Sequence, residues 1–503
     1  MLTPPLNCPV LHRLPVEATF DLPMERRPPL SDLTVQHVGQ HMAVVVADSP
    51  EHATYAASLF DLRYEVRPAA SDMDAVLANA QPPDENDGEI RYGSYLPDHF
   101  VKLDEEKKLQ DRRGPQAEPD LAARVSAQYT TPLNAHYPIE LSATIAQWHG
   151  MQLTVHDASR WLAASVPRSP PTSHGRIRGS DSVALVGGAF GAKSFLWMHV
   201  ALCAVAAREV ERPVKLVLTR NQMFSSTGGH RPRTRQQVTL VADDGGTLHS
   251  VEHHTLTETS TVAHFCEPAG LSSRILYQTP RLVVSHRVAR INEPTPCFMR
   301  GPGEAPGLFA LESAMDELAV ELNMDPLDLR IRNHVDVDQA SGKPWSGKHL
   351  LDCYELGAQR FGWDKRPREP RSLSDSGIQL GWGGMATATY PGRRMPASCS
   401  VATAADGSVQ FASATHEIGT GVRTVMCQVA ADAAGLSLSQ VTFESGDSLF
   451  PDAPVQRSVP DDGYGRLGCS CRCHAVERPP ARAAARRRDD ALQRNGRVSG
   501  HRW

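Results

Sequence analysis

VGGAFGAKS, residues 186–194, is the stretch on which the choice of fold depends. It is close to the phosphate-binding loop of nucleoside triphosphatases, in which a glycine immediately precedes the lysine. Here Ala192 stands before Lys193 instead. Three interpretations follow: an altered ATP site, a chance cluster of glycines, or a loop built for a different phosphate-bearing ligand.

Two further glycine-rich loops favour the third interpretation. Residues 300–304 (RGPGE) and 417–421 (EIGTG) each precede a helical pattern, as the first loop does. Unpaired N–H groups at a helix start attract anions, and glycine lets a ligand approach the backbone. Helices also begin after glycine for steric reasons alone, so a single loop is weak evidence. Three loops indicate a large anionic ligand, and Arg300 adds a guanidinium fork suited to phosphate or oxo groups.

The segments around these loops interleave strands and helices, which predicts an α/β or α+β fold with mixed sheets. Strands are expected at 41–47 and 62–68, on either side of a helix over 49–60 that Ser49 caps. Alternating apolar residues predict further strands. A stretch that is apolar nearly all round predicts a buried helix over 195–209, and Asp325 before Pro326 predicts a capped short helix over 324–334. The expected strands lie at 143–150, 152–159, 213–219, 236–243, 247–256 and 281–291.

The helix expected after the second loop has a clear apolar stripe. Apolar side chains recur every three or four residues, which places them on one helical face. Glu312 is among the acidic residues that fall off this stripe and is expected on the solvent side. The stripe consists of Leu308, Leu311, Met315, Leu318 and Leu322.

Composition excludes several classes of protein. With 503 residues the chain has room for two to four domains, and 41% hydrophobic with 22% charged residues is typical of a soluble globular protein. A net charge of −5 argues against a general nucleic-acid binder. The longest apolar run, near 195–207, is too short to span a bilayer, and the N-terminus lacks a signal-peptide pattern. The sequence alone therefore predicts a cytoplasmic protein without membrane insertion.

Residues 456–503 differ from the rest of the chain, with eleven arginines and no lysine. Such a segment cannot bury enough apolar surface to fold, so we expect it to be disordered. It is either a basic interaction tail or sequence translated out of frame. Cys469, Cys471 and Cys473 beside His474 also suggest a metal knuckle, but C-x-C-x-C-H lacks the spacers of a zinc site.

Three segments together resemble the molybdenum-binding subunit of the xanthine dehydrogenase/aldehyde oxidase family. They are GGAFGAK, the long stretch FMRGPGEAPGLFALESAMDELAVELNMDPLDLRIRNH, and HEIGTGVRTVMCQVAADAAGLSLSQVTFESGDS. The resemblance is strongest to the bacterial periplasmic-type aldehyde oxidase branch. GQHMAVVVADSPEHATYAASLFDLRYEV is similar to the a/b hammerhead domain that precedes the cofactor domains in this family. The likeness extends from about residue 30 to 455.

The resemblance implies a domain order. An α+β chain is expected, with a partial a/b hammerhead domain followed by two molybdopterin-binding-type domains, the second incomplete. The implied ranges are 1–75 for the hammerhead part, 76–120 for a linker, 121–345 and 346–455 for the two cofactor domains, and 456–503 for a non-homologous tail.

The resemblance also implies a function. It is the oxidative hydroxylation of an aldehyde or N-heterocycle with oxygen from water, using molybdopterin cytosine dinucleotide and partner subunits that carry [2Fe-2S] and FAD. The pterin, not a side chain, would hold the molybdenum. With such partners the compartment becomes either the cytoplasm or the bacterial periplasm, reached by co-export with a signal-bearing iron–sulfur subunit.

Site residues are carried over by position. Gly188, Ala189, Phe190 and Gly191 would border the molybdenum, and Arg300 would lie beside the pterin. Pro302 and Arg394 are candidates for the substrate side. Ile418, Gly419 and Thr420 would donate backbone N–H groups to the cofactor's phosphates.

Two departures from the family pattern limit these expectations. The family's general base is a Glu in a GVGE-like motif, which has no counterpart here, so no catalytic residue is assigned. Residues 164–182 replace an apolar strand before GGAFG. The sequence is therefore interpreted as truncated and frameshifted, and the alternative to an active subunit is a catalytically inactive remnant or partner-binding scaffold.

Overall fold

The structure is a computed structural model that describes most of the chain between residues 29 and 453. Residues 80–120 of the linker predicted at 76–120, the irregular stretch at 164–182, Arg394 and most of the tail lie outside the described residues. The described residues are 29–31, 33–79, 123–159, 185–263, 265–339, 344–345, 347–369, 372–381, 383–390, 397–451, 453 and 473–475.

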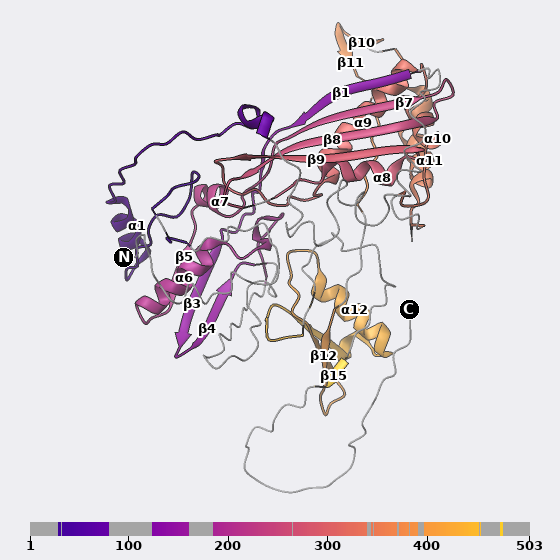
Figure 1. Ribbon diagram of the computed structural model, residues 1–503. Coiled ribbons are helices and arrows are strands. Elements are labelled where there is room, and N and C mark those ends of the chain that lie inside the picture. Colours follow the sequence, from indigo (N-terminus) through magenta and orange to yellow (C-terminus); the bar gives the residue numbers. More distant parts are fainter. Residues whose placement is uncertain are drawn as a thin grey trace.

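A four-stranded sheet forms the larger core of the first unit, which we define as residues 123–339. Its strands follow the order β1-β7-β8-β9, antiparallel except for the parallel pair β8 and β9. α9 covers one face of this sheet (Figure 1). The mixture of parallel and antiparallel strands with packed helices confirms the predicted α+β class. The elements are β1 (Ala123–Thr131), β7 (Thr234–Ala242), β8 (Leu248–Ser260), β9 (Arg281–Ile291) and α9 (Glu304–Glu321).

A three-stranded antiparallel sheet of order β4-β3-β5 forms the smaller core of the first unit. α6 packs on it and is buried over most of its surface, because its residues are apolar nearly all round. The helix begins three residues later than the sequence predicts. The elements are β3 (Ala143–His149), β4 (Gln152–Asp157), β5 (Val214–Val217) and α6 (Met198–Glu209).

The N-terminal segment forms one helix as expected. α1 (Pro50–Ser58) starts at the predicted position because Ser49 Oγ accepts a hydrogen bond from the His52 N–H at 3.2 Å. The strands predicted at 41–47 and 62–68 are wrong, since neither range forms one. Val44 and Val46 instead pack against the core beneath α6. A short apolar run indicates burial without specifying a strand partner.

The stripe on α9 is confirmed, because Leu308, Leu311, Met315 and Leu318 are all buried. Glu312 corrects the prediction, since it is only 4% exposed. Its Oε2 accepts hydrogen bonds from Arg330 Nε at 2.8 Å and from the Thr387 N–H at 2.7 Å, and Tyr277 also donates to its carboxylate. Arg330 lies on α10 (Pro326–Arg332), and its buried guanidinium supplies the positive charge that lets a carboxylate lie in the core.

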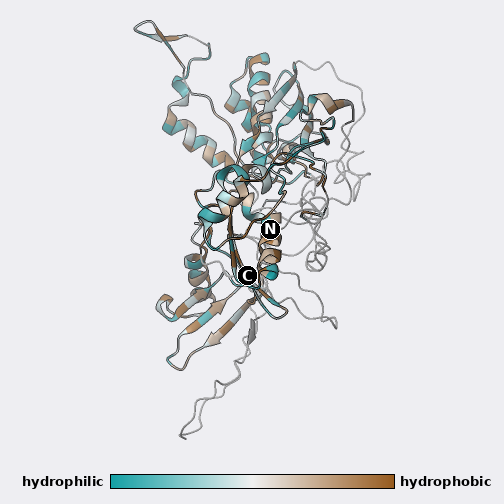
Figure 2. Cartoon of the chain, turned by 90° about the vertical axis from the view of Figure 1, so that its left-hand side faces the viewer, coloured by the Kyte–Doolittle hydropathy of each residue, from teal (hydrophilic) through white to brown (hydrophobic). Residues whose placement is uncertain are grey.

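The second unit, residues 350–451, contains the predicted strand, loop and helix. Parallel strands β13 and β14 are joined by α12, and β12 pairs with β13. The hairpin β10–β11 stands apart from the rest of the molecule (Figures 1 and 2). The elements are α11 (Leu350–Phe361), β10 (Leu373–Asp375), β11 (Ile378–Leu380), β12 (Cys399–Thr403), β13 (Val409–Ala412), α12 (Val422–Ala434) and β14 (Val441–Glu444).

Part of the tail corrects the expectation of disorder. β15 (Cys473–Ala475) pairs in parallel with β12, whose edge is otherwise open to backbone hydrogen bonding. Among the described residues no three His, Cys, Asp or Glu side chains form a group that could hold a metal ion.

The other elements are short. The described part of the chain contains no helix with the length and hydropathy that crossing a membrane requires. The short elements are η1 (Asp74–Asn79), β2 (Asn134–Ala135), η2 (Ala192–Ser194), α7 (Arg220–Ser226), β6 (His230–Arg231), η3 (Ala269–Ser272), α8 (Ser273–Leu276), η4 (Trp363–Lys365) and η5 (Leu438–Gln440).

Candidate functional site

The three glycine-rich loops contact one another through their backbones. The Val186 N–H donates to the Glu417 carbonyl oxygen at 2.9 Å, which joins the first loop to the third. The Arg300 N–H donates to the Phe190 carbonyl oxygen at 3.1 Å, which joins the second loop to the first. Segments more than 100 residues apart in the chain therefore form one cluster, with the first loop at its centre.

The first loop contains two kinds of predicted site residue. Gly188 and Gly191 have positive φ values of 93° and 124°, and a side chain at Gly191 would overlap the carbonyl oxygen of Phe298. Ala189 is buried, whereas Phe190 is 46% exposed with a φ of 51° that is unusual for a residue other than glycine. The glycines thus allow close packing against the second loop, while the Phe190 ring remains accessible to a ligand.

Lys193 decides against an ATP site. Its Nζ donates to Glu140 Oε2 at 2.5 Å, and its side chain is 1% exposed. The same carboxylate oxygen accepts a hydrogen bond from the Gly187 N–H at 2.9 Å. α6 begins only at Met198, so the N–H groups of its first turn do not belong to the glycine-rich loop. The lysine anchors the loop and is not available to a triphosphate.

Arg231 donates hydrogen bonds to the backbone of the second loop. One of its guanidinium nitrogens, Nη2, donates to the carbonyl oxygens of Met299, Arg300 and Gly301 at 2.9, 2.7 and 3.1 Å. Arg231 belongs to β6, which pairs with β2, so the guanidinium projects from a fixed strand. No local pattern predicts this role of Arg231, because the contacts join residues about 70 positions apart.

A buried carboxylate completes this anchor. Glu267 Oε1 accepts a hydrogen bond from the Gly303 N–H at 2.7 Å and lies 3.3 Å from Arg231 Nε. Burial raises the pKa of Glu267, although Arg231 and the Gly303 N–H oppose that change. Its Oε2 is buried and has no hydrogen-bond partner among the described residues. In the sequence, the one indication of this role is that Glu267 is the single acidic residue in the stretch HFCEPAG.

The two predicted site residues of the second loop lie at its surface. Arg300 is exposed, and its guanidinium forms no hydrogen bond or ion pair within the described part of the chain. Pro302 is partly buried between two glycines with positive φ. The loop therefore presents an unpaired cation from a rigid backbone, an arrangement suited to an anionic ligand.

The third loop is closed by its own carboxylate. Glu417 Oε1 accepts hydrogen bonds from the Gly419 and Gly421 N–H groups at 2.7 and 3.0 Å. The predicted donor Gly419 is thus engaged within the loop, while Thr420 is exposed and Ile418 partly buried. A side chain added at Gly419 or Gly421 would meet nothing within 4 Å. The loop has open space beside its backbone, which a ligand requires for close approach.

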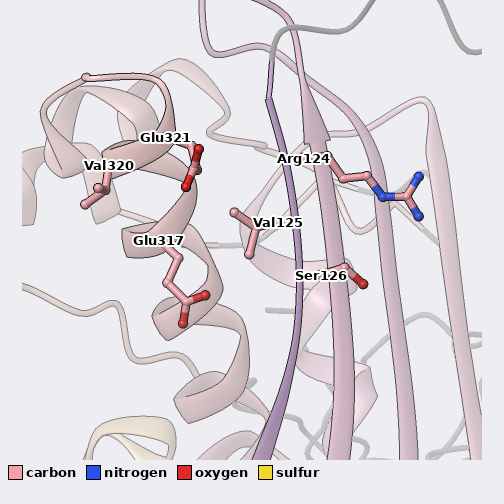
Figure 3. A pocket seen from close by; sticks show the side chains of 6 residues that line it. All are labelled: Arg124, Val125, Ser126, Glu317, Val320 and Glu321. Atoms are coloured by element: carbon pink, nitrogen blue, oxygen red, sulfur yellow. The ribbon is translucent and has the colours of Figure 1, made fainter.

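A pocket of about 360 Å³ lies elsewhere, at the edge of the large sheet. Figure 3 shows Glu317 and Glu321 on α9, Val125 pointing toward that helix, and Arg124 pointing away from it. Glu317 is 13 residues beyond Glu304, which places it about 20 Å along the helix from the second loop. This pocket is therefore separate from the loop cluster. Arg394 lies outside the described residues, and its place on the substrate side stays a prediction.

Known protein families match the two parts of the chain that contribute loops to this cluster. Residues 112–334 and 356–454 each match the family model of a molybdopterin cofactor-binding domain. The aldehyde oxidoreductase molybdenum-binding subunit PaoC of Escherichia coli (strain K12) is 33% identical over 425 residues, which cover 83% of this chain and 54% of that protein.

Two further relatives extend the comparison. The putative xanthine dehydrogenase molybdenum-binding subunit XdhA of Escherichia coli (strain K12) is 27% identical, with coverage of 81% of this chain and 54% of the relative. The aldehyde oxidoreductase of Desulfovibrio desulfuricans ATCC 27774 has the same fold, with a TM-score of 0.65 at 20% identity over 84% of this chain and 46% of that one.

The chain spans about half the length of the curated relatives that it matches. Both cofactor-domain matches fall on the units that carry the three loops. The chain belongs to the molybdopterin cofactor-binding family that contains the molybdenum-binding subunits of aldehyde oxidoreductases and xanthine dehydrogenases.

Proposed function

We propose that this chain binds a molybdopterin cofactor at its three glycine-rich loops and serves as the molybdenum-binding part of a molybdenum hydroxylase. The observation that carries the proposal is the pair of backbone hydrogen bonds, Val186 to Glu417 and Arg300 to Phe190, that unites the three loops. Loops from both matched cofactor domains thereby contribute to one site.

The residues present fit such a ligand. Its phosphates are anionic, and the exposed guanidinium of Arg300 has no other partner among the described residues. Gly419 leaves the backbone of the third loop open to close approach. Residues 188–191, Arg300 and residues 418–420 would hold the cofactor, and Pro302 with Arg394 would lie toward the substrate.

Each loop has a distinct part in this proposal. The first loop sets the position of the other two, and its exposed Phe190 ring would shield one side of the substrate space from water. Arg300 would orient the cofactor through charge. When bound, the cofactor supplies the redox chemistry that oxidises the substrate carbon and passes electrons onward.

The finer assignments are part of the same proposal. We infer the cytosine dinucleotide form of the cofactor, partner subunits with [2Fe-2S] and FAD, and an aldehyde or N-heterocycle as substrate. Similarity to molybdenum-binding subunits of aldehyde oxidoreductase and xanthine dehydrogenase supports them. For the compartment we propose the cytoplasm, with the periplasm as the alternative if an iron–sulfur partner directs export.

Metal and nucleotide analysis tests the proposal directly. The chain is produced together with candidate iron–sulfur and FAD subunits, purified, and assayed for molybdenum and for cytidine monophosphate released by acid. We expect about one of each per chain. Arg300→Ala should lower both contents. Absence of molybdenum and cytidine monophosphate from the wild type would refute the proposal.

A further inference from the structure

We propose that Arg231 and Glu267 are positioning residues, which act through the backbone of residues 299–303 to set Arg300 for the cofactor. This inference rests on the proposed function. Neither side chain belongs to the glycine-rich loops, and both are almost completely buried, with exposed side-chain fractions of 8% and 0%.

Arg231 fixes the direction of the loop carbonyl groups. Its Nη2 contacts three consecutive carbonyl oxygens, those of residues 299, 300 and 301, all within 3.1 Å. Consecutive carbonyl groups in an extended chain point in alternating directions, so their convergence on one nitrogen requires a curved backbone. A lysine has the charge but lacks the planar guanidinium, which places one nitrogen on the carbonyl oxygens and another 3.3 Å from Glu267 Oε1.

Glu267 holds the end of the same curve. Its Oε1 receives the Gly303 N–H and faces Arg231 Nε, so a single oxygen connects the guanidinium to the residue before α9. Gly303 is the N-cap of α9 and has a φ of 77°. The carboxylate therefore links the loop to the helix while its charge balances the buried guanidinium.

The opposite side of the loop is attached as well. The Cys297 N–H donates to the His230 carbonyl oxygen at 3.0 Å, and the Arg300 N–H donates to Phe190 at 3.1 Å. With both its N–H and its carbonyl group engaged, Arg300 retains only its side chain as a free group. Such preorganisation lowers the entropic cost of binding, because the ligand does not have to order the loop.

The Glu312–Arg330 pair offers a matched control. It is as deeply buried, with exposed side-chain fractions of 5% and 0%, and it also joins a carboxylate to a guanidinium. Its hydrogen bonds to other residues reach Tyr277, Pro326 and Thr387, none of which belongs to the three loops. A loss of stability at this pair should leave the cofactor site in place.

The experiment compares Glu267→Gln and Arg231→Lys with Glu312→Gln in the complex with its partner subunits. Molybdenum and cytidine monophosphate content, the thermal unfolding midpoint and amide exchange of residues 297–305 are measured for each. All three variants should unfold at lower temperature than the wild type. Only the first two should lose cofactor, by about tenfold, and only they should exchange about tenfold faster in 297–305.

Two outcomes would overturn the inference. One is cofactor content that follows the unfolding midpoint equally in all three variants, which would make the pair merely structural. The other is unchanged exchange of 297–305 in Glu267→Gln. If the wild type carries no molybdenum, the proposed function fails, and the exchange measurement alone decides whether this pair holds the loop.

Discussion

The second and third glycine-rich loops use the same kind of anchor, a buried glutamate, with different partners. In each, a glutamate carboxylate accepts a hydrogen bond from the glycine that caps a helix, Gly303 before α9 and Gly421 before α12. Glu267 in the first case is 0% exposed and paired with Arg231. Glu417 has no ion-pair partner within the described part of the chain and binds backbone N–H groups of its own loop.

The glycines that cap the two helices serve different purposes. At Gly303 a side chain would come within 2.6 Å of the Pro268 carbonyl oxygen, so glycine is required for packing. At Gly421 a side chain would meet nothing within 4 Å, so glycine leaves space beside the backbone. The second loop is thus fixed by the fold around it, whereas the third is held chiefly by its own residues and has room for a ligand.

The largest expected effect is the removal of the cation beneath the second loop. Arg231→Met leaves Glu267 buried without its partner, and we expect a loss of about 3–5 kcal/mol in the free energy of unfolding. Arg423→Met is the matched change at the third loop, where Ser445 is the guanidinium's only hydrogen-bond partner among the described residues. It should cost at most about 1.5 kcal/mol, since no buried charge is left behind. Urea unfolding measures both, and equal losses would erase the contrast between the loops.

Alanine at the two capping glycines tests packing together with backbone strain. Gly303 and Gly421 have nearly equal φ values, 77° and 75°, but ψ is −49° at Gly303 and 25° at Gly421, and only Gly421 lies in the left-handed helical region that other residues can adopt. Gly421→Ala should lose about 1 kcal/mol from that strain. Gly303→Ala should lose roughly 2–4 kcal/mol, because its new methyl group meets Pro268. A difference of less than about 1 kcal/mol by chemical denaturation would contradict the structure at Gly303.

The sequence predicts the helices better than it predicts the buried charged residues that hold the loops and the core. The stripe on α9 and the cap of α10 by Asp325 are local patterns, and both are confirmed. Glu267 and Arg231 are 36 residues apart, and no local pattern connects them. Glu312 lies on the helix whose period is correctly predicted, yet its burial depends on a guanidinium from the next helix. Charges inside a core are decided by tertiary partners, which periodicity does not contain.

The strands predicted between residues 143 and 291 are confirmed as β3, β4, β5, β7, β8 and β9, and strand prediction failed only in the N-terminal segment, for the same physical reason. Residues 41–47 and 62–68 have suitable composition, but a strand also needs a neighbour with free N–H and C=O groups. β15 shows the converse, because an Arg-rich tail without a strand pattern pairs with the open edge of β12. Composition therefore indicates that a segment can form a strand, and a free neighbouring edge decides whether it does.

Acidification should destabilise the part of the fold that contacts the second loop. Burial, assisted by His136, lowers the pKa of His230 from 6.5 to about 4, and the His230 carbonyl oxygen holds the Cys297 N–H. The unfolded chain takes up this proton as pH falls below 6.5, while the folded chain does not. The stability contributed by the neutral imidazole is therefore complete above pH 6.5 and is lost toward pH 4, by roughly 3 kcal/mol.

Unfolding free energies at intervals from pH 7.5 to 4.5 measure this loss, with His230→Gln as the comparison. The variant should depend less steeply on pH over that window than the wild type. Equal slopes for the two proteins would show that His230 is not held neutral by the fold.

The smallest expected effect is at the third loop. Burial acts to raise the pKa of Glu417, but the N–H groups of Gly421, Gly419, Arg423 and Thr420 together lower it below 4.5. Its contribution is therefore complete above pH 4.5 and is lost only as pH falls further. Glu417→Ala should cost about 1–2 kcal/mol at pH 7, as for the loss of a helix cap.

Water explains why this cost is small. Gly419 is exposed, so its N–H group can bond to solvent once the carboxylate is gone. No such replacement exists at the second loop, where Gly303 and Glu267 are both buried, and Glu267→Ala should cost more than Glu417→Ala under the same conditions. A cost above about 3 kcal/mol for Glu417→Ala in urea unfolding would mean that the third loop is as fixed as the second. The open space beside Gly419 would then belong to a rigid surface and not to a loop that adjusts to its ligand.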